Sequence, residues 1–221
     1  MNTTISSSIS SSTQLLRTQI YEYLRGQLRN GELRPGMFVS INKMVENLGI
    51  SRTPLRDALL QLQVEGFVTF LPQRGIKINE LNPQAIEDIY EVMGALDSRV
   101  LISVFEKVGP EDVEEMRKVN ERMLLAAQEK AFYTYWELNS DFHGVYLNFS
   151  KNNLILYHLN ILRQRLFGFG EINWGNELIT LNYNEHLKII ELIQKGSPKT
   201  AADYIRDVHV RLPIHLIKEE S

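Results

Sequence analysis

The segment spanning residues 41–79 constrains the fold most, because it sets two helical patterns and two β-rich runs in a single order. The first helical pattern ends at Gly49, and Ser51 caps a second one over residues 52–65. Two helices joined by a short turn that contains glycine are typical of a helix-turn-helix motif. The runs FVTFL and GIKIN then flank a Pro-Gln-Arg-Gly turn, which predicts a hairpin. Together with an amphipathic helix expected over 13–30, these elements describe a winged helix-turn-helix.

The chain divides into three parts. Residues 1–12 are rich in Ser and Thr, with neither a basic start nor an apolar run, so we expect a disordered tail and no signal peptide. Residues 13–80 form the predicted winged helix-turn-helix domain. Residues 83–219 carry helical patterns only, which Gly and Pro breaks separate into six segments: 83–107, 110–129, 131–149, 153–169, 178–195 and 198–219. The predicted fold class is therefore mainly α, with a winged helix-turn-helix followed by an all-α six-helix antiparallel bundle.

Composition excludes several classes of protein. With no cysteine among 221 residues, the chain has no disulfide framework, thiolate zinc site or cysteine nucleophile. No stretch reaches the roughly 20 consecutive apolar residues that a membrane span needs, so we expect a cytoplasmic protein without membrane contact. Residues 1–80 hold nine basic and six acidic residues, whereas the remainder holds 15 basic and 21 acidic ones. A basic first domain joined to an acidic second domain predicts different partners for the two.

The start of the second helix suits a DNA-recognition helix. Its first turn presents backbone N–H groups and the positive end of the helix dipole, and the hydroxyls of Ser51 and Thr53 add donors for phosphates. Arg52 and Arg56 are four residues apart and share one face, and the arginine fork matches guanine in the major groove. The opposite face carries the expected core anchors: Leu55, Leu59 and Leu62.

The hairpin tip adds a second contact region. Arg74 and Gly75 would let the wing approach the DNA backbone or the minor groove. Two alternatives stay open from the residues alone. The arginines can be an ordinary solvated helix face, or the winged helix can serve as a protein-interaction module without DNA.

Histidines in the bundle indicate a candidate metal site. Asn139 and His143 are one helical turn apart on one face, and His186 and His209 lie on two later helices. Three imidazoles and one oxygen would suit a divalent metal such as Zn²⁺ or Ni²⁺. The alternative is that the histidines are core or boundary residues. A metal-dependent enzyme is a further alternative, but the sequence offers no nucleophile elbow, phosphate loop or HExxH motif.

Three residues are candidates for contact with a small-molecule effector. Trp136 belongs to an aromatic stretch just before Asn139 that can wall a pocket or fill the bundle core. Arg163 can reach an anionic effector or lie on a solvated helix face. Tyr90 lies on the first helix of the bundle, where a hydroxyl can face the same pocket.

The first domain resembles the winged-helix domain of the GntR family of bacterial transcription regulators. The resemblance rests on INKMVENLGISRTPLRDALLQLQVEGFV…RGIKIN, which covers residues 41–79. In that family the residues matching Ser51, Arg52, Arg56 and the wing glycine Gly75 contact DNA. The resemblance implies one more polar contact, at one of two neighbouring positions: Asn42 or Lys43.

The bundle resembles the FCD ligand-binding domain of the FadR subfamily, and its six helices are more like the shorter VanR-type branch. The order Asn139-x-x-x-His143, then His186 and finally His209 is similar to the family's Asp-x-x-x-His followed by two histidines. In many members these residues hold a metal that presents a small carboxylate effector. This chain departs from the pattern at Asn139, which replaces an aspartate, and at Met93, where many relatives carry an arginine that binds carboxylates.

The two resemblances imply a DNA-binding transcription regulator rather than an enzyme. Because a single recognition helix buries little surface, we expect a homodimer that binds a palindromic operator in double-stranded DNA. A small metabolite, most simply an organic acid, is expected to bind the bundle and control the affinity for the operator, with a divalent metal as the candidate cofactor.

Overall fold

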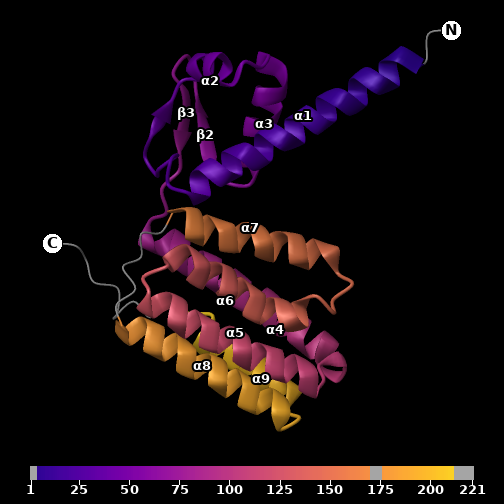
Figure 1. Cartoon of the computed structure of the whole chain (residues 1–221), viewed down its shortest axis with the longest axis vertical. Coiled ribbons are helices and arrows are strands. Elements are labelled where there is room, and N and C mark those ends of the chain that lie inside the picture. The colour runs from indigo at the N-terminus through magenta and orange to yellow at the C-terminus, as the bar shows by residue number, and fades with distance from the viewer. Residues whose placement is uncertain (1–3, 170–175, 212–221) are drawn as a thin grey trace. The chain divides into compact units, whose positions relative to one another are not determined.

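The computed structural model describes residues 4–169 and 176–211, shown in Figure 1. The chain separates into two compact units, one formed by the N-terminal part up to Leu81 and one formed from Asn82 onward, with the end of helix α7 grouped with the first. No helix in the described ranges combines the length and the apolar character needed to cross a bilayer.

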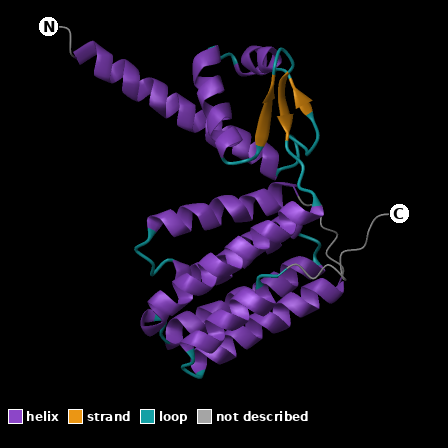
Figure 2. Cartoon of the chain, turned by 180° about the vertical axis from the view of Figure 1, so that it is seen from behind, coloured by secondary structure: helices purple, strands orange, loops and turns teal. Residues whose placement is uncertain are grey.

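The first unit is the predicted winged helix-turn-helix, with three helices and a small antiparallel sheet (Figure 2). In the sheet the central strand β3 pairs with both other strands, in the order β1-β3-β2. The elements are α1 (Thr4–Arg29), β1 (Phe38–Val39), α2 (Ile41–Leu48), α3 (Arg52–Val64), β2 (Val68–Leu71) and β3 (Gly75–Ile78).

Caps and a buried stripe fix the helix-turn-helix. The Ser40 side chain accepts a hydrogen bond from the Lys43 backbone N–H at the start of α2, and Gly49 ends that helix with φ of 62°. The predicted core anchors of α3 are confirmed, since all three leucines are buried together with Pro54 and Ala58. Burying this face leaves the other face of α3 to solvent.

The tip of the hairpin requires glycine at its end. Gly75 has φ of 100°, and a Cβ there would lie 2.2 Å from the Val39 carbonyl oxygen. A side chain at this position would therefore push β1 away from β3. The predicted hairpin is confirmed, but β1 was not expected from sequence, because two residues carry no readable alternation.

The N-terminal segment differs from the sequence-based expectation. We expected residues 1–12 to be a disordered tail, yet α1 begins at Thr4, nine residues before the predicted start. No glycine or proline occurs between Thr4 and Arg25, so nothing in the sequence interrupts a helix there. Residues 1–3 lie outside the described ranges.

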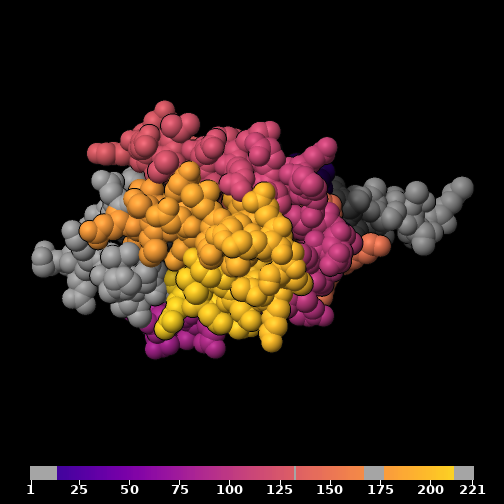
Figure 3. All heavy atoms as spheres, turned by 90° about the horizontal axis from the view of Figure 1, so that it is seen from below, coloured from indigo at the N-terminus to yellow at the C-terminus, as the bar shows by residue number. Residues whose placement is uncertain are grey.

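The second unit is an all-helical bundle, and its helices follow the predicted segments closely. The elements are α4 (Pro83–Val104), the 3₁₀ turn η1 (Phe105–Lys107), α5 (Pro110–Gln128), α6 (Phe132–Leu147), α7 (Asn153–Phe169), α8 (Asn176–Gln194), α9 (Pro198–Tyr204) and the π turn η2 (Ile205–His209). Asn82 caps α4 through a 2.7 Å hydrogen bond from the Ala85 backbone N–H to its Oδ1. Viewed from below, α8 and α9 cover one face of this unit (Figure 3).

The end of the bundle departs from the single helix predicted over 198–219. Helix α9 stops at Tyr204, and one π turn follows that carries His209 inward. Gly94 on α4 permits this turn to approach, because a Cβ there would lie 3.2 Å from the Arg206 carbonyl oxygen. Single π turns are frequent at functional sites. The remainder of the predicted helix, from residue 212 onward, lies outside the described ranges.

Candidate nucleic-acid interface and metal centre

The predicted recognition surface is exposed at the start of α3. Arg52, Thr53 and Arg56 all face solvent, as does Ser51 immediately before them. Within residues 4–169 and 176–211 the guanidinium groups of Arg52 and Arg56 form no ion pair with a carboxylate. Arg52 Nη2 instead donates to Asn42 Oδ1 on α2 over 3.1 Å. A neutral partner orients this guanidinium without cancelling its charge, which suits contact with a base edge or a phosphate.

Ser51 occupies the N-cap position of α3, as predicted, but its hydroxyl makes no capping hydrogen bond. The hydroxyl and the first backbone N–H groups of the helix are therefore available to an external acceptor. A helix N-terminus with uncapped donors is a natural position for a phosphate group. Lys43, on the neighbouring helix α2, is exposed as well.

The wing presents Arg74 to solvent at the tip of the hairpin. Its backbone N–H donates to the Leu71 carbonyl and closes the turn, so the side chain is free of any role in the hairpin itself. Gly75 has a structural reason to be glycine, which is its close approach to Val39.

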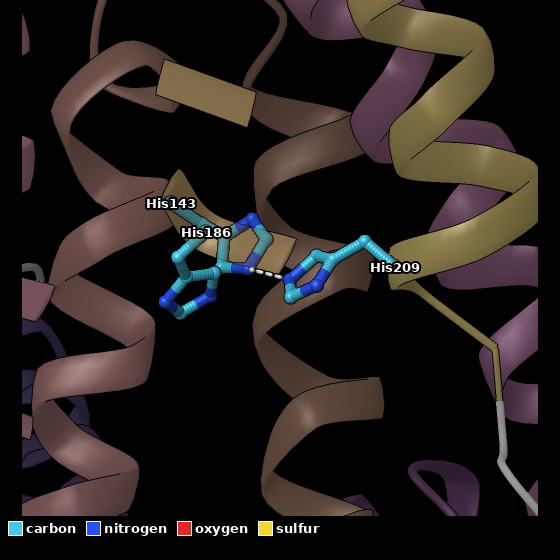
Figure 4. A group of neighbouring side chains, drawn as sticks. All are labelled: His143, His186 and His209. Carbon is cyan, nitrogen blue, oxygen red and sulfur yellow. Dashed lines mark hydrogen bonds between the residues drawn. The ribbon is translucent and has the colours of Figure 1, made fainter. Parts of the chain in front are cut away.

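The three predicted histidines meet in the second unit. Ligand atoms of His143 on α6, His186 on α8 and His209 on η2 all lie within 4.8 Å of one another, and all three side chains are buried (Figure 4). The Nε2 atoms of His143 and His209 are 3.1 Å apart. Phe142 stacks on the ring of His186, with 3.7 Å between centroids, and fixes its plane.

A buried carboxylate orients His143. Its Nδ1 lies 3.1 Å from Asp97 Oδ2 and 2.8 Å from the Tyr146 hydroxyl, which itself donates to Asp97 Oδ1. Arg163 Nη2 donates to the same carboxylate over 2.9 Å. With Nδ1–H committed to these oxygens, the lone pair of His143 is on Nε2, toward the other histidines.

The other two histidines are held in the same way. His186 Nδ1 lies 2.9 Å from Asn120 Oδ1, and the Asn120 amide in turn donates to the Tyr183 carbonyl over 3.1 Å. His209 Nδ1 lies 3.0 Å from Glu185 Oε2. Each ring thus has an oxygen acceptor at Nδ1, and the three rings meet in one cluster, an arrangement typical of metal-binding histidines.

Burial keeps the imidazoles of His143 and His186 neutral. It lowers the pKa of His143 to about 4, although Asp97 acts to raise it, and it lowers the pKa of His186 well below the ordinary value. The pKa of Asp97 is below its ordinary value: burial acts to raise it, but His143 and Arg163 more than offset that effect. Neutral imidazole is the form that binds a metal, so these two rings need no deprotonation near pH 7.

Two buried acceptors at the site lack a partner among the described residues. They are Asn139 Oδ1, one turn before His143, and His186 Nε2. A buried acceptor without a donor is unfavourable, and a cation would satisfy both atoms at once. The three histidines therefore fit a divalent metal, and an oxygen ligand from Asn139, in place of the aspartate common in the FCD domain, stays a prediction.

The predicted effector contacts lie in different surroundings. Trp136 is half-buried and packs edge-on against Tyr135, with centroids 5.4 Å apart. Tyr90 is in an apolar environment that raises the pKa of its hydroxyl. Arg163 is buried and paired with Asp97, so it is neither solvated nor a free cation. Contact of these three side chains with an effector remains a prediction.

Sequence reasoning missed the groups that orient the histidines. Asp97 and Asn120 are polar residues on the buried stripes of α4 and α5, and that position was a readable signal of a polar network. Tyr146 gives the same signal of a polar network, because its hydroxyl lies on the buried face of α6, three residues after His143. Glu185 directly precedes His186, but its partner His209 comes from a distant turn, so no local sequence signal indicated their pairing.

Comparison with protein families agrees with both units. Residues 16–78 match the family model described as bacterial regulatory proteins, gntR family, and residues 88–210 match the FCD domain. The chain belongs to the GntR family of bacterial regulatory proteins. Its FCD domain is consistent with the predicted FadR-like subfamily, and the predicted fold class is confirmed.

Similar GntR-family proteins are named as regulators. The chain is 23% identical over 194 residues to the HTH-type transcriptional regulator YdhC of Bacillus subtilis, covering 85% of this chain and 84% of that one. It is 32% identical over 126 residues to an HTH-type transcriptional regulator from the ttuE-ttuC' intergenic region of Agrobacterium vitis, covering 56% and 74%. The structure of McbR/YncC of Escherichia coli shares the fold, with a TM-score of 0.71 at 19% identity over 88% of this chain and 93% of that one. The chain is thus a DNA-binding transcription regulator whose FCD domain is of the ligand-binding type.

Proposed function

We propose that this GntR-family regulator binds a palindromic operator as a homodimer in the cytoplasm, and that a divalent metal in the FCD domain presents an anionic effector that changes operator affinity. The observation that carries the metal part is the convergence of three imidazole rings, each with an oxygen acceptor at its Nδ1. No catalytic role is part of the proposal.

The DNA contacts follow from the exposed residues of the first unit. Arg52 and Arg56 reach the base edges, while Ser51, Thr53 and the N–H groups of the first turn bind phosphates. Further contacts to the backbone come from three exposed polar residues and the wing glycine: Asn42, Lys43, Arg74 and Gly75. Two copies are needed because a single recognition helix covers one half-site.

The metal would be held by His143, His186, His209 and Asn139. Imidazole ligands suit zinc and nickel, and a position left open on the ion would accept a carboxylate oxygen. The protein's own contribution is to keep the rings oriented, through Asp97, and to enclose the site. Trp136, Tyr90 and Arg163 remain the proposed surroundings of the effector.

A binding titration tests the DNA part. The full chain is titrated onto a labelled fragment of its own upstream DNA, with fluorescence anisotropy as the readout and Ni²⁺ or EDTA present. We expect Arg52→Ala to lose specific binding, whereas Arg122→Ala, which removes an exposed arginine of the bundle, binds like wild type. Wild-type affinity of Arg52→Ala would contradict the assignment of the recognition helix.

The same samples test the metal and the dimer. Light scattering is expected to give the mass of two chains, and elemental analysis after loading is expected to give one metal per chain. Operator affinity is also measured with and without small carboxylates, in EDTA and in Ni²⁺. If all four affinities are equal, the proposal that a metal links the effector to DNA binding is wrong, even if the protein binds its operator.

A further inference from the structure

Helix α8 repeats the pattern of α6. The pair Asn139-x-x-x-His143 on α6 has a counterpart in Asn182-x-x-x-His186 on α8. Residues four apart on a helix lie one above the other on the same face. That face of α8 is the buried one, since it also carries Ile179. Two helices therefore each offer an amide one turn before a histidine of the cluster in Figure 4.

Asn182 shares an unusual condition with this cluster. Its Oδ1 is buried and accepts no hydrogen bond from the described residues, which is also true of Asn139 Oδ1 and His186 Nε2. Buried acceptors in folded proteins nearly always have a donor, so each exception calls for a physical explanation. Here the three exceptions come from two pairs of matching sequence, Asn139 with His143 on α6 and Asn182 with His186 on α8, and both histidines belong to one cluster.

A single cation explains all three atoms. Arg163, a buried arginine of this unit, is not available for this task, because it is paired with Asp97. An amide carbonyl oxygen is a good ligand for a divalent metal and binds it without a change of protonation.

We propose that Asn182 is an additional oxygen ligand of the metal, alongside Asn139 and the three histidines. This inference rests on the metal site of the proposed function. The resulting ligand set has three imidazole nitrogens and two amide oxygens, all neutral. Five protein donors exceed the four of a tetrahedral zinc site, so a six-coordinate ion keeps one position for the effector.

A neutral ligand set has a consequence for the effector class. The bound ion keeps its full double positive charge, because no carboxylate ligand cancels part of it. The site then attracts an anionic effector through the ion itself. This explains how the FCD domain can select carboxylates although Met93 stands where many relatives carry an arginine.

Titration with Ni²⁺ alone tests the proposal, using a competing chromophoric chelator and the full chain. We expect Asn182→Leu to weaken Ni²⁺ binding about 10-fold or more and Asn182→Asp to strengthen it. Asn184→Leu is the matched control, since Asn184 lies two residues away on the exposed face of α8 and should leave Ni²⁺ affinity unchanged. A thermal melt of each variant in EDTA checks folding. The apo form of Asn182→Leu should melt no lower than wild type, because leucine removes an unsatisfied polar group.

The outcomes separate this inference from the proposed function. If Asn182→Leu binds Ni²⁺ like wild type while His186→Ala does not, Asn182 is not a ligand and the histidine site stands. If His186→Ala also binds Ni²⁺ like wild type, the metal site itself is wrong. A large drop in the apo melting temperature of Asn182→Leu would indicate a structural role and overturn the proposal.

Discussion

Arg163 on α7 and Asp97 on α4 form a buried ion pair of 2.9 Å, and the same carboxylate oxygen lies 3.1 Å from His143 Nδ1. One carboxylate thus neutralises a guanidinium and orients an imidazole of the histidine cluster. Helix α7, which contributes no ligand, is tied to the site through this pair. Removing the carboxylate charge therefore tests stability and metal binding together.

Asp97→Asn should destabilise the protein and weaken its metal site. The substitution leaves Arg163 as a buried charge without an anion, which typically costs about 3–5 kcal/mol of unfolding free energy. It also loosens His143, and lost orientation of a ligand usually lowers metal affinity by about 10–100-fold. Urea unfolding and Ni²⁺ titration measure the two effects. Asp88→Asn, at an exposed position of α4, is the control and should change neither.

Asn120→Leu should weaken metal binding through His186 alone. Asn120 accepts from Nδ1 of that ring, and without it the ring can rotate or adopt the other tautomer. We expect a loss of Ni²⁺ affinity of about 10–100-fold. Glu121→Gln, the adjacent exposed position on α5, should bind Ni²⁺ like wild type. Equal affinities of the two variants would show that Asn120 does not act through His186.

Local sequence signals predicted the helices well, because the start and end of a helix depend on residues that are close together in the chain. The boundaries of α4 and α5 coincide with Asn82-Pro83 and Gly109-Pro110, where a cap and a first-turn proline are encoded side by side. The π turn that carries His209 was not predicted, because a single wide turn has no repeating sequence period.

The candidate site was only partly predictable for a related reason. The sequence predicts Asn139 and His143 on one face of a helix, since residues four apart on a helix share a face. The partners of the rings come from other helices: Asp97 lies 46 positions before His143, and Glu185 lies 24 positions before His209. Such pairs depend on how the helices pack, which hydrophobic periodicity alone does not specify.

Gly75→Ala should disrupt the wing. The substitution places a Cβ 2.2 Å from the Val39 carbonyl oxygen at a φ of 100°, so β1 and β3 must separate. We expect a loss of about 1–3 kcal/mol of unfolding free energy, the usual cost of such backbone strain. Gly26→Ala is the contrasting change, since its Cβ would meet nothing within 4 Å inside α1. That variant should gain up to about 1 kcal/mol from helix propensity. If Gly75→Ala lowered the unfolding free energy no more than Gly26→Ala does, the pairing of β1 with β3 at this position would be contradicted.

Arg52 and Lys43 should differ in how they contribute to operator binding. Arg52 is oriented by Asn42, and its guanidinium can donate two hydrogen bonds to one base edge. Lys43, by contrast, is an exposed point charge on α2. Arg52→Lys keeps the charge but loses the fork, so it should cost about 1–3 kcal/mol on the operator and little on unrelated DNA. Lys43→Ala should weaken both DNAs similarly and reduce the slope of log affinity against log salt by about 1. Anisotropy titrations at several salt concentrations, on operator and unrelated duplexes, distinguish the two patterns. If Arg52→Lys instead weakened both duplexes equally, Arg52 would be a phosphate contact and the reading of bases would fall to Arg56.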